Sequence, residues 1–384
     1  MRLEFDDEEE LLRTTAREFT EKELQPYLDA LPDAPMPRET VQRIMRMVAP
    51  LGILSARLPS EAGGAGMSYV QLGILYEELP AEVAMDASGN DLALFRLHHG
   101  CTAEVRDRYV EGLASGRLLA GSAISEPGAG SDLSSISTKA RREDDHYVVT
   151  GTKIWSSQAA VADVLLVAAS FGTDERGRAR IGRLLVDRTQ SPFTIRPTEM
   201  IGLRRHHMAE VTFDDCVVPG THLVGEPGEG TEVYALSWLS HRPCIGLIAV
   251  HLAREALARS LAHARQRTQF GRPIGSFQLV QHLLVEMSTL VDTSRYLCYR
   301  ALHLLDAGKP ARYESAVAKA YATEAAVKVT SMAMQVHGAM GLSVELGVEK
   351  LFRDARMLTI PDGTTQIQQL IAGRELLGLS AVRG

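Results

Sequence analysis

Apolar side chains recur every three or four residues through much of the first third of the chain. This spacing is typical of helices that bury one face and expose the other. Acidic residues open the first such stretch, where negative charge suits the positive end of the helix dipole. We therefore expect an N-terminal helical region, with helices within residues 6–24, 37–54, 69–82 and 104–121.

The pattern changes near Gly121. Short runs of β-branched and other apolar residues replace the helical spacing, and turns rich in glycine, proline and aspartate separate these runs. This pattern of short apolar runs and turns predicts an antiparallel β domain. The expected strands lie within residues 146–157, 162–170, 182–187, 193–200 and 209–219.

Helical spacing then returns and continues to the end of the chain. Residues 244–267, 276–305 and 314–338 each carry one apolar face, and short connections join them. Long antiparallel helices with short connections are typical of a bundle. The fold class is therefore α+β and mainly α, and ligands favour the seams between such parts. The expected domains are helical (1–120), antiparallel β (121–228) and a C-terminal helical bundle (229–384).

Composition and charge exclude several classes of function. The 384 residues are 45% hydrophobic and 23% charged, which suits a large globular core. A net charge of -7 argues against general nucleic-acid binding, which needs a basic face. No apolar run reaches the length of a membrane span, and the acidic N-terminus resembles neither a secretory signal nor a transit peptide. The scattered cysteines predict a cytoplasmic protein without a disulfide framework or zinc cluster.

The strongest local signal is SEPGAGSD, residues 125–132. Its glycines, Gly128 and Gly130, permit backbone turns closed to other residues and the close approach of a ligand. Ser125 and Ser131 add hydroxyl groups, and successive free N–H groups can receive polar or anionic atoms. A hairpin turn with capping serines explains the same residues equally well.

The segment KIWSS, residues 153–157, places one of only two tryptophans before two hydroxyl residues. An indole and two hydroxyls suit a flat heteroaromatic ring with a polar edge. A tryptophan in the core of a sheet is the commoner arrangement and stays open as an alternative. The adjacent pairs His98–His99 and His206–His207 point their side chains apart on a helix or strand, so we expect no metal site.

The segment RQRTQFGRPIGSFQ, residues 265–278, ends one expected helix and begins the next. Arg267 suits a helix C-terminus simply as a cation. Together with Gln278 it also suits a phosphate, because arginine binds phosphate through two parallel donors. Gly338 and Gly341 follow another helix end, where they are either C-caps or clearance for a cofactor.

Taken together, these stretches resemble the acyl-CoA dehydrogenase family of flavoproteins over essentially the whole chain. The resemblance rests on five segments in register, namely AISEPGAGSD, GTKIWSS, IGLRRHHMAEVTFDDCVVP, ARQRTQFGRPIGSFQ and VEKLFRDARMLTIPDGTTQIQ. It implies an N-terminal helical domain, a middle β domain and a C-terminal four-helix bundle. It also implies FAD in the crevice between the β domain and the bundle. The assembly that it implies is a homodimer or, more usually, a homotetramer built as a dimer of dimers.

Carried over by position, the resemblance assigns cofactor contacts along the whole chain. Those implied at the flavin ring are Ser125, Gly130, Ser131, Trp155, Ser156 and Ser157, with Trp155 over one side of the ring and Ser157 near N5. Those implied on the FAD of a neighbouring subunit are Arg267, Phe270, Gln278, Gln335, Gly338 and Ala339. Thr364 and Gln366 would return to the FAD of their own subunit. The thioester substrate would meet Ser131, His241, Arg242 and Gly363.

The family chemistry removes an α-proton from an acyl thioester and passes hydride from the β-carbon to flavin N5. The α-proton is only weakly acidic, so the reaction needs a positioned base and stabilisation of an enolate-like transition state. Most relatives with the base on this loop carry glutamate, whereas the matching acid here is Asp362, after Pro361. Some family branches place a glutamate on the preceding long helix, where this chain has His241. Asp362 is therefore the expected base.

Aspartate in place of glutamate is the main departure from the family pattern. The shorter side chain withdraws the carboxylate by about 1 Å, and such a displacement can cost about 10²-fold in rate. Nitroalkane oxidases of the same superfamily use aspartate as their base, so a flavin oxidase acting on a small acidic carbon substrate is an alternative. Two simpler alternatives also stay open. Asp362 caps the following helix and does nothing else, or the chain is a non-catalytic binding or assembly protein.

Several positions carry polar residues where simple fatty-acyl enzymes have less polar ones, namely Arg96, His98, His99, Arg205, His206 and His207. They favour a polar or short branched acyl group, carried on CoA or on an acyl carrier protein, although solvated surface is the simpler explanation. The resemblance implies an electron-transferring flavoprotein as electron acceptor. Acyl chain length, carrier and acceptor do not follow from the sequence.

Overall fold

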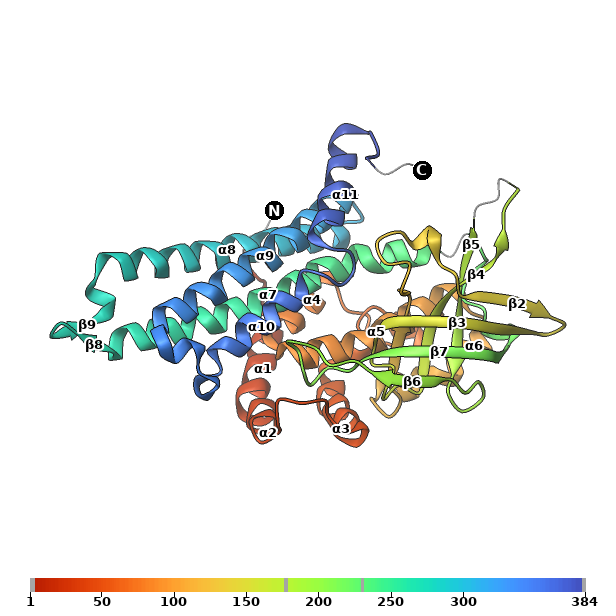
Figure 1. Cartoon of the computed structure of the whole chain (residues 1–384), viewed down its shortest axis with the longest axis horizontal. Coiled ribbons are helices and arrows are strands. Elements are labelled where there is room, and N and C mark those ends of the chain that lie inside the picture. Colours follow the sequence, from red (N-terminus) through yellow and green to blue (C-terminus); the bar gives the residue numbers. More distant parts are fainter. Residues whose placement is uncertain (1–3, 176–178, 229–230, 382–384) are drawn as a thin grey trace.

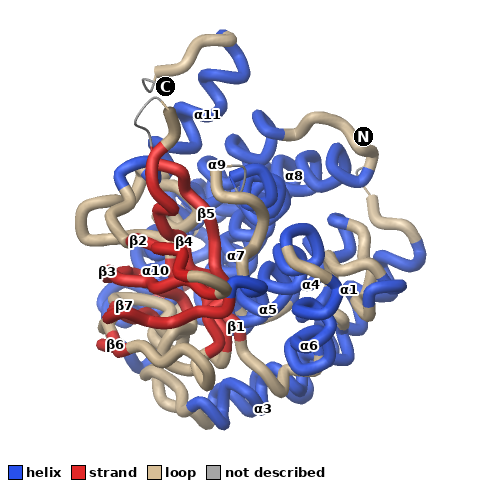
Figure 2. The backbone as a smooth tube through the Cα atoms, turned by 90° about the vertical axis from the view of Figure 1, so that its right-hand side faces the viewer, coloured by secondary structure: helices blue, strands red, loops and turns tan. Residues whose placement is uncertain are grey.

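The computed structural model describes residues 4–175, 179–228 and 231–381. Helices occupy both ends of the chain and a β-sheet lies between them in sequence (Figure 1). The strands of the large sheet gather on one side of the molecule, and α5 lies against β1 (Figure 2). Among the described residues, no helix is long and apolar enough to cross a bilayer.

The N-terminal helices match the expected ranges in part, since the apolar spacing predicted no helix over residues 25–29 or 83–100. They are α1 (Asp7–Phe19), α2 (Gln25–Asp29), α3 (Arg38–Val48), α4 (Tyr69–Glu78), α5 (Ala81–Gly100) and α6 (Ala103–Ala114). A capping box fixes the first of them. Asp6 accepts from the Glu9 amide at 2.9 Å, and the Glu9 carboxylate accepts from the Asp6 amide at 3.0 Å. A single turn of π-helix, Thr20–Leu24, joins α1 to α2.

The strands and the C-terminal helices complete the fold. The strands are β1 (Ala120–Ala123), β2 (Lys139–Glu143), β3 (His146–Ser157), β4 (Val164–Thr173), β5 (Ala179–Asp187), β6 (Thr194–Pro197), β7 (Met208–Pro219), β8 (Thr268–Gln269) and β9 (Arg272–Pro273). The helices are α7 (Thr231–Gln266), α8 (Gln278–Asp306), α9 (Arg312–His337), α10 (Val348–Leu358) and α11 (Thr365–Leu377). The long helices α7, α8 and α9 build the expected bundle, and α10 and α11 pack on α9.

The sheet is mixed, which corrects the antiparallel arrangement expected from the sequence. Its strand order is β1–β4–β2–β3–β7–β6, with β5 paired to β4. β1 runs parallel to β4, and Lys139 of β2 pairs in parallel with Ser170 of β4. Parallel neighbours need a long crossover. The chain between β1 and β4 provides one, because it first forms the hairpin β2–β3.

Separate apolar cores explain how the parts are joined. The largest core packs side chains of α1, α3, α4 and α5 against α7, α8, α9 and α10, so the two helical regions share one interior. A second core consists mainly of side chains from the strands of the large sheet. A third lies between α5, α6 and the strands β1, β4 and β5. The β domain is therefore fastened to α5, and α5 in turn packs against the bundle.

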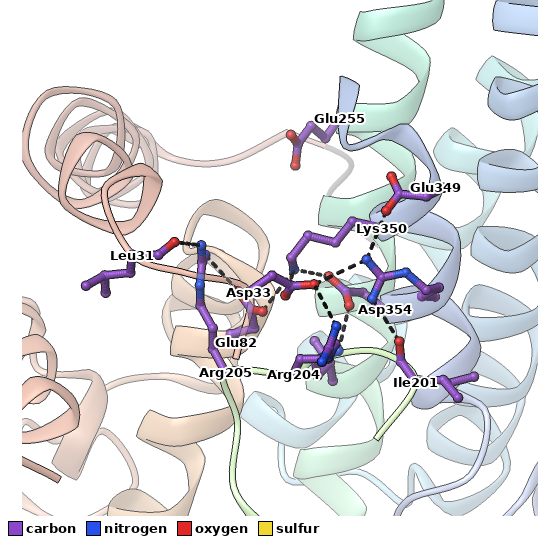
Figure 3. A network of polar contacts seen from close by, with 12 residues as sticks. Leu31, Asp33, Glu82, Ile201, Arg204, Arg205, Glu255, Glu349, Lys350 and Asp354 are labelled. Carbon is purple, nitrogen blue, oxygen red and sulfur yellow. Dashed lines mark hydrogen bonds and ion pairs between the residues drawn. The ribbon is translucent and has the colours of Figure 1, made fainter. Parts of the chain in front are cut away.

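Polar contacts cross the seam between the N-terminal helices, the loop before β7 and α10 (Figure 3). Lys350 of α10 donates to Glu82 of α5 at 2.9 Å and to Asp354 at 2.5 Å. Arg205, from the loop before β7, pairs with Glu82 at 3.5 Å. Arg205 also donates to the carbonyl of Leu31 at 2.7 Å. The network brings all three parts of the chain together at one place.

Candidate active site

A buried ion pair holds two of the sequence motifs together. Lys153, on β3 just before Trp155, donates from Nζ to Glu126 Oε1 at 2.7 Å and to the Ile124 carbonyl at 3.0 Å. The side chains of Lys153 and Glu126 are 0% and 2% exposed. The pair therefore fixes the loop after β1, which carries Ser125, against the end of β3.

Glu126 is the anchor of this loop. Its carboxylate also accepts from the Ser137 amide at 2.7 Å, the Ser137 hydroxyl at 2.6 Å and the Thr138 amide at 2.9 Å. Burial would raise the pKa of Glu126, but Lys153 and these donors lower it to about 2. Burial likewise lowers the pKa of Lys153 to about 8. At neutral pH the pair is charged and the loop is preformed.

A β-bulge turns Trp155 outward. The register of β3 against β7 shifts between Lys153 and Ser156, and Trp155 has a φ of 53°. Its side chain is 53% exposed. Bulges often re-aim a side chain at the edge of a site. The indole is thus an exposed aromatic platform beside Ser156 and Ser157, and the core-tryptophan interpretation is wrong.

The hydroxyl groups near this platform differ in their surroundings. Ser156 Oγ is buried and has no hydrogen-bond partner among the described residues. Ser157 Oγ approaches Met208 Sδ at 3.7 Å, and Ser131 is exposed. Buried hydroxyls are normally paired. Ser156 therefore holds unused hydrogen-bonding capacity beside the platform.

The glycines of the loop after β1 contribute space rather than an unusual conformation. Gly128 and Gly130 permit turns closed to other residues, but neither has a positive φ. A Cβ added at either position would meet nothing within 4 Å. Glu126 and Ala129 pair across a tight hairpin turn, as the alternative interpretation of this segment predicts. The open space is what the approach of a ligand to the backbone requires.

Asp362 lies in a turn between α10 and α11 that is held from inside the bundle. The φ angles of Asp362 and Gly363 are 53° and 97°, and positive φ in a non-glycine residue marks a conformation that its surroundings enforce. Lys319 Nζ donates to the carbonyls of Thr359 at 3.0 Å and Gly363 at 2.7 Å. Gln368 Nε2 donates to the carbonyls of Asp362 at 2.8 Å and Gly363 at 3.0 Å.

The amides of the same turn are available. Within the part of the chain that the structure describes, the N–H groups of Asp362 and Gly363 donate no hydrogen bond to the protein. Glycine is needed at position 363 on two counts. Its φ is positive, and a Cβ would lie 2.7 Å from Gln368 Nε2. The turn thus presents two free donors beside a carboxylate.

That carboxylate meets basic groups on α7. His241 Nδ1 lies 2.5 Å from Asp362 Oδ2, and Arg242 Nε donates to the Asp362 carbonyl at 3.4 Å. Burial would raise the pKa of Asp362, but His241, Arg242 and Arg96 lower it to about 2. Asp362 is therefore ionised throughout the neutral range and able to accept a proton.

Asp362 does not cap the helix that follows it, so the cap-only explanation is wrong. The N-cap of α11 is Thr364, whose side chain accepts from the Ile367 amide at 3.4 Å. Gln366, in the first turn of α11, is exposed. The acid in this turn is free of a structural capping task.

Arg96 connects the start of α7 to β1, whose Ser122 pairs with Ser157 at the end of β3. Its guanidinium, buried on α5, donates to Ser122 of β1 at 3.2 Å and to Ser237 of α7 at 3.2 Å. Ser237 lies about one turn before His241 on the same helix. Arg96 also lowers the pKa of Asp362. The loop after β1, the start of α7 and the Asp362 turn therefore form one site.

The buried position of Arg96 corrects one sequence-based interpretation. Arg96 is not solvated surface, and neither is His206, whose Nδ1 lies 2.5 Å from Asp86 Oδ1 in the interior. Its neighbour His207 points elsewhere, with Nε2 2.6 Å from the Met36 carbonyl. The two histidines thus face different partners.

The remaining expected cofactor residues lie elsewhere in the chain. Arg267, Phe270 and Gln278 are exposed around the β8–β9 hairpin, at the end of the bundle away from the sheet (Figure 1). The exposed residues Gln335, Gly338 and Ala339 lie at the same end, because His337 stacks on His263 with ring centroids 4.4 Å apart. One chain therefore does not bring this group to Asp362.

Sequence reasoning missed the residues that hold the site in place, namely Glu126, Lys153, Lys319 and Gln368. Two of them had a signal. Glu126 lies inside SEPGAGSD and Lys153 inside KIWSS, and a charged residue within an apolar strand normally has a buried partner. Lys319 had none, because it acts on backbone carbonyls of a distant segment. Gln368 ends the quoted segment around Asp362, but its bonds to the Asp362 and Gly363 carbonyls follow from the shape of the turn.

Comparisons with known proteins cover nearly the entire chain. Residues 6–117, 121–216 and 228–377 match the N-terminal, middle and C-terminal domains of acyl-CoA dehydrogenase, respectively. The mouse mitochondrial short-chain specific acyl-CoA dehydrogenase is 32% identical over 98% of this chain and 91% of its own length. The cyclohexane-1-carbonyl-CoA dehydrogenase of Geobacter metallireducens is 34% identical over 87% of this chain and 89% of its own.

Solved structures show the same likeness. Butyryl-CoA dehydrogenase from Megasphaera elsdenii superposes with a TM-score of 0.91, and the two chains share 28% sequence identity. The match covers 98% of this chain and 100% of the other. The sequence and structural comparisons therefore point to one family of enzymes, whose members act on different acyl groups.

Proposed function

Since the chain belongs to the acyl-CoA dehydrogenase family, we propose that it oxidises the α,β carbon–carbon bond of an acyl thioester with Asp362 as the base. The family consists of oxidoreductases that act on CH–CH groups with FAD, so the interpretation as a non-catalytic binding protein is set aside. One observation carries the proposal. An ionised carboxylate with two free amides beside it lies in the site that Arg96 connects to β1 through Ser122.

The residues present fit FAD. The exposed indole of Trp155 offers a face for a flat ring, and the unpaired hydroxyl of Ser156 offers a hydrogen bond. The open space at Gly130 admits a close approach to the backbone. We assign the ring contacts to these residues and to Ser125, Ser131, Ser157, Thr364 and Gln366. When bound, FAD accepts the hydride that leaves the β-carbon of the substrate.

The exposed group at the far end of the bundle serves the FAD of a second copy. Arg267, Phe270 and Gln278 are exposed there, with Phe270 93% exposed. A bare aromatic side chain and an arginine suit the adenosine and phosphate parts of a dinucleotide. Gln335, Gly338 and Ala339 lie at the same end and complete the set. We therefore propose a homodimer or homotetramer as the working form.

The chain's own groups have defined tasks in the reaction. Asp362 takes the α-proton on a carboxylate oxygen, and the electrons of that C–H bond become the new C=C bond. The N–H groups of Asp362 and Gly363 donate to the thioester carbonyl, where negative charge develops. A positioned base contributes about 10² to 10⁴ in rate, and a donor at the developing oxyanion contributes about 10² to 10³.

The same geometry supports a restricted acyl group. We assign contacts with the thioester to Arg242 and Ser131, whereas His241, whose side chain is 5% exposed, lies behind Asp362. The buried guanidinium of Arg96 favours a polar or short branched acyl chain over a long alkyl chain. The carrier is CoA or an acyl carrier protein. An electron-transferring flavoprotein in the cytoplasm would reoxidise the cofactor.

A second candidate function rests on the basicity of Asp362. Three basic groups lower its pKa to about 2, and a weak base matches a carbon whose proton is more acidic than that of a thioester. A flavin oxidase of the nitroalkane type would use such a proton, with O₂ as the oxidant. The choice of substrate therefore decides between the two functions.

The decisive experiment is anaerobic bleaching of the purified holoenzyme by a substrate panel. The panel contains acyl-CoA thioesters of graded length, branched and polar acyl-CoAs, and nitroethane. We expect at least one acyl-CoA to bleach the flavin, and bleaching only by nitroethane would replace the first function with the second. Asp362→Asn keeps the shape but removes the proton acceptor, so it should lower the bleaching rate by about 10²-fold or more.

The matched control is His251→Ala, on α7 but outside the site, where Nδ1 lies 2.9 Å from the Glu77 carbonyl. This variant should bleach at the wild-type rate. FAD content per chain is measured for each variant. If Asp362→Asn bleached at the wild-type rate with full FAD content, Asp362 would not be the base.

A further inference from the structure

The position of His241 gives it a place behind the proposed base. Its Nδ1 lies 2.5 Å from Asp362 Oδ2, across two segments that are 121 residues apart in sequence. The side chain of Asp362 is 21% exposed and that of His241 only 5%. Asp362 therefore faces the open side of the site, and the imidazole covers the carboxylate from the interior.

The imidazole has one polar task among the described residues. Its Nδ1 contacts Asp362, and its Nε2 is buried without a hydrogen-bond partner in the described part of the chain. The ring of Tyr76, from α4, packs edge-on against it with centroids 6.0 Å apart. Because Tyr76 packs against the imidazole and Nδ1 makes its one polar contact, His241 is placed to orient the Asp362 carboxylate. His241 Nδ1–H donates to the ionised carboxylate.

This contact also accounts for the short acid at position 362. The Nδ1–Oδ2 distance is already 2.5 Å, so the carboxylate has no room to extend toward α7. One further methylene would add about 1.5 Å to the side chain. A glutamate here would have to displace the imidazole or leave its turn, and the turn is pinned by Lys319 and Gln368.

From this arrangement we infer that His241 is a positioning residue that holds the carboxylate of Asp362, and that the two side chains are matched in length. The inference rests on the proposed function, since it assumes that Asp362 takes the substrate proton. His241 then acts on Asp362 from the interior of the protein and does not contact the substrate directly. The length of residue 362 and the identity of residue 241 are therefore coupled.

A double-variant cycle tests this coupling. Asp362→Glu alone misplaces the carboxylate by about 1 Å and should slow anaerobic flavin reduction by about 10²-fold. His241→Ala alone frees the carboxylate and should slow it by about tenfold or more. The double variant Asp362→Glu/His241→Ala gives the longer acid room, and we expect it to be roughly tenfold faster than Asp362→Glu alone.

Two further variants separate positioning from general loosening of α7. Asp362→Glu/His251→Ala removes a different histidine of the same helix and should stay as slow as Asp362→Glu. His241→Asn keeps an N–H donor close to the position of Nδ1, so it should be faster than His241→Ala. FAD content and the thermal unfolding midpoint of each variant show that the comparison is made between folded holoenzymes.

The outcomes distinguish this inference from the proposed function. If wild type reacts and Asp362→Asn does not, yet the double variant is no faster than Asp362→Glu, the positioning role is wrong while the proposed base stands. The positioning role is equally wrong if His241→Asn and His241→Ala are equally slow. A fully active Asp362→Asn would remove the base itself, and the coupling with it.

Discussion

At the scale of single residues, buried charge governs how the site is held. Glu126 and Lys153 are the clearest case, because both side chains are removed from water and the carboxylate accepts four hydrogen bonds. A pair of this kind adds little over an apolar pair, but removing one partner leaves the other charge buried and uncompensated. Its effect is therefore visible only when the pair is broken.

We predict that Glu126→Gln destabilises the protein by about 3–5 kcal/mol, because Lys153 keeps its buried charge without a partner. The pKa of Glu126 is lowered to about 2 from its ordinary 4.5. Its stabilisation is therefore complete above pH 4.5 and is lost as the pH falls through about 2. The difference in unfolding free energy between wild type and variant, from urea titrations, should be larger at pH 6 than at pH 3.5.

The double variant Glu126→Gln/Lys153→Met is the matched control, since it removes both charges. It should recover most of the lost stability. The prediction would be contradicted by a double variant less stable than Glu126→Gln, or by a difference from wild type that did not change with pH.

The residues to which we assign chemistry were easier to find in the sequence than the residues that hold them in place. Asp362 and Trp155 stand in quoted motifs, so a single sequence singles them out. The pairing of His241 with Asp362 joins positions that no local pattern connects. Arg96 was noticed as polar, but its burial depends on Ser122 and Ser237 from two other elements. Nothing in its own neighbourhood in the sequence indicates this.

At the scale of elements, strands with an apolar face were predictable and polar ones were not. β3 spans His146–Ser157 as its alternating pattern indicates. β2 is the sequence KARRE, with charges on its exposed positions, and β1 is the short AGSA, so neither resembles a strand locally. They become strands because β3 and β4 offer them edges. The parallel pairing of β1 with β4 is likewise a property of the sheet.

The turn between α10 and α11 provides a test at this scale. We predict that Lys319→Met, which keeps the length of the side chain but not its donors, releases the Thr359 and Gly363 carbonyls. The carboxylate of Asp362 then moves, and a displacement of about 1 Å should slow flavin reduction about 10²-fold. FAD should stay bound, and amide hydrogen exchange should increase in residues 359–364.

The control for this variant lies on the same helix. Lys328 of α9 pairs with Glu286 of α8 at 2.5 Å on the exposed surface, so Lys328→Met should leave flavin reduction unchanged. A wild-type rate in Lys319→Met would show that Gln368 alone holds the turn.

At the scale of the whole molecule, the site exists only where three parts of the chain meet. The platform comes from the β domain, Arg96 from the N-terminal helices and Asp362 from the C-terminal part. The spacing of apolar residues predicted these parts and their order, because this spacing differs between helices and strands. It did not predict the contacts between them, since each seam uses a few charged residues whose partners are remote in sequence.

The network around Lys350 tests whether buried charged residues join the three parts of the chain (Figure 3). Glu82 and Asp354 are 6% and 2% exposed, and Lys350 donates to both. Burial raises the pKa of Asp354 to about 6. Between pH 3.8 and about 6, the folded protein therefore holds a proton on Asp354 that the unfolded chain has lost. The stabilisation that this gives is complete below pH 3.8 and is lost as the pH rises through about 6.

We predict that Lys350→Met lowers the free energy of unfolding by about 3–5 kcal/mol at pH 7, because two buried carboxylates lose their common cation. The loss should shrink toward pH 5, where Asp354 takes up a proton and needs no partner. Urea titrations followed by circular dichroism at both pH values measure it. Lys350→Arg keeps the charge and should lose much less. A loss equally large at pH 5 and pH 7 would mean that Lys350 acts through packing of its stem, and the seam would then not depend on charge.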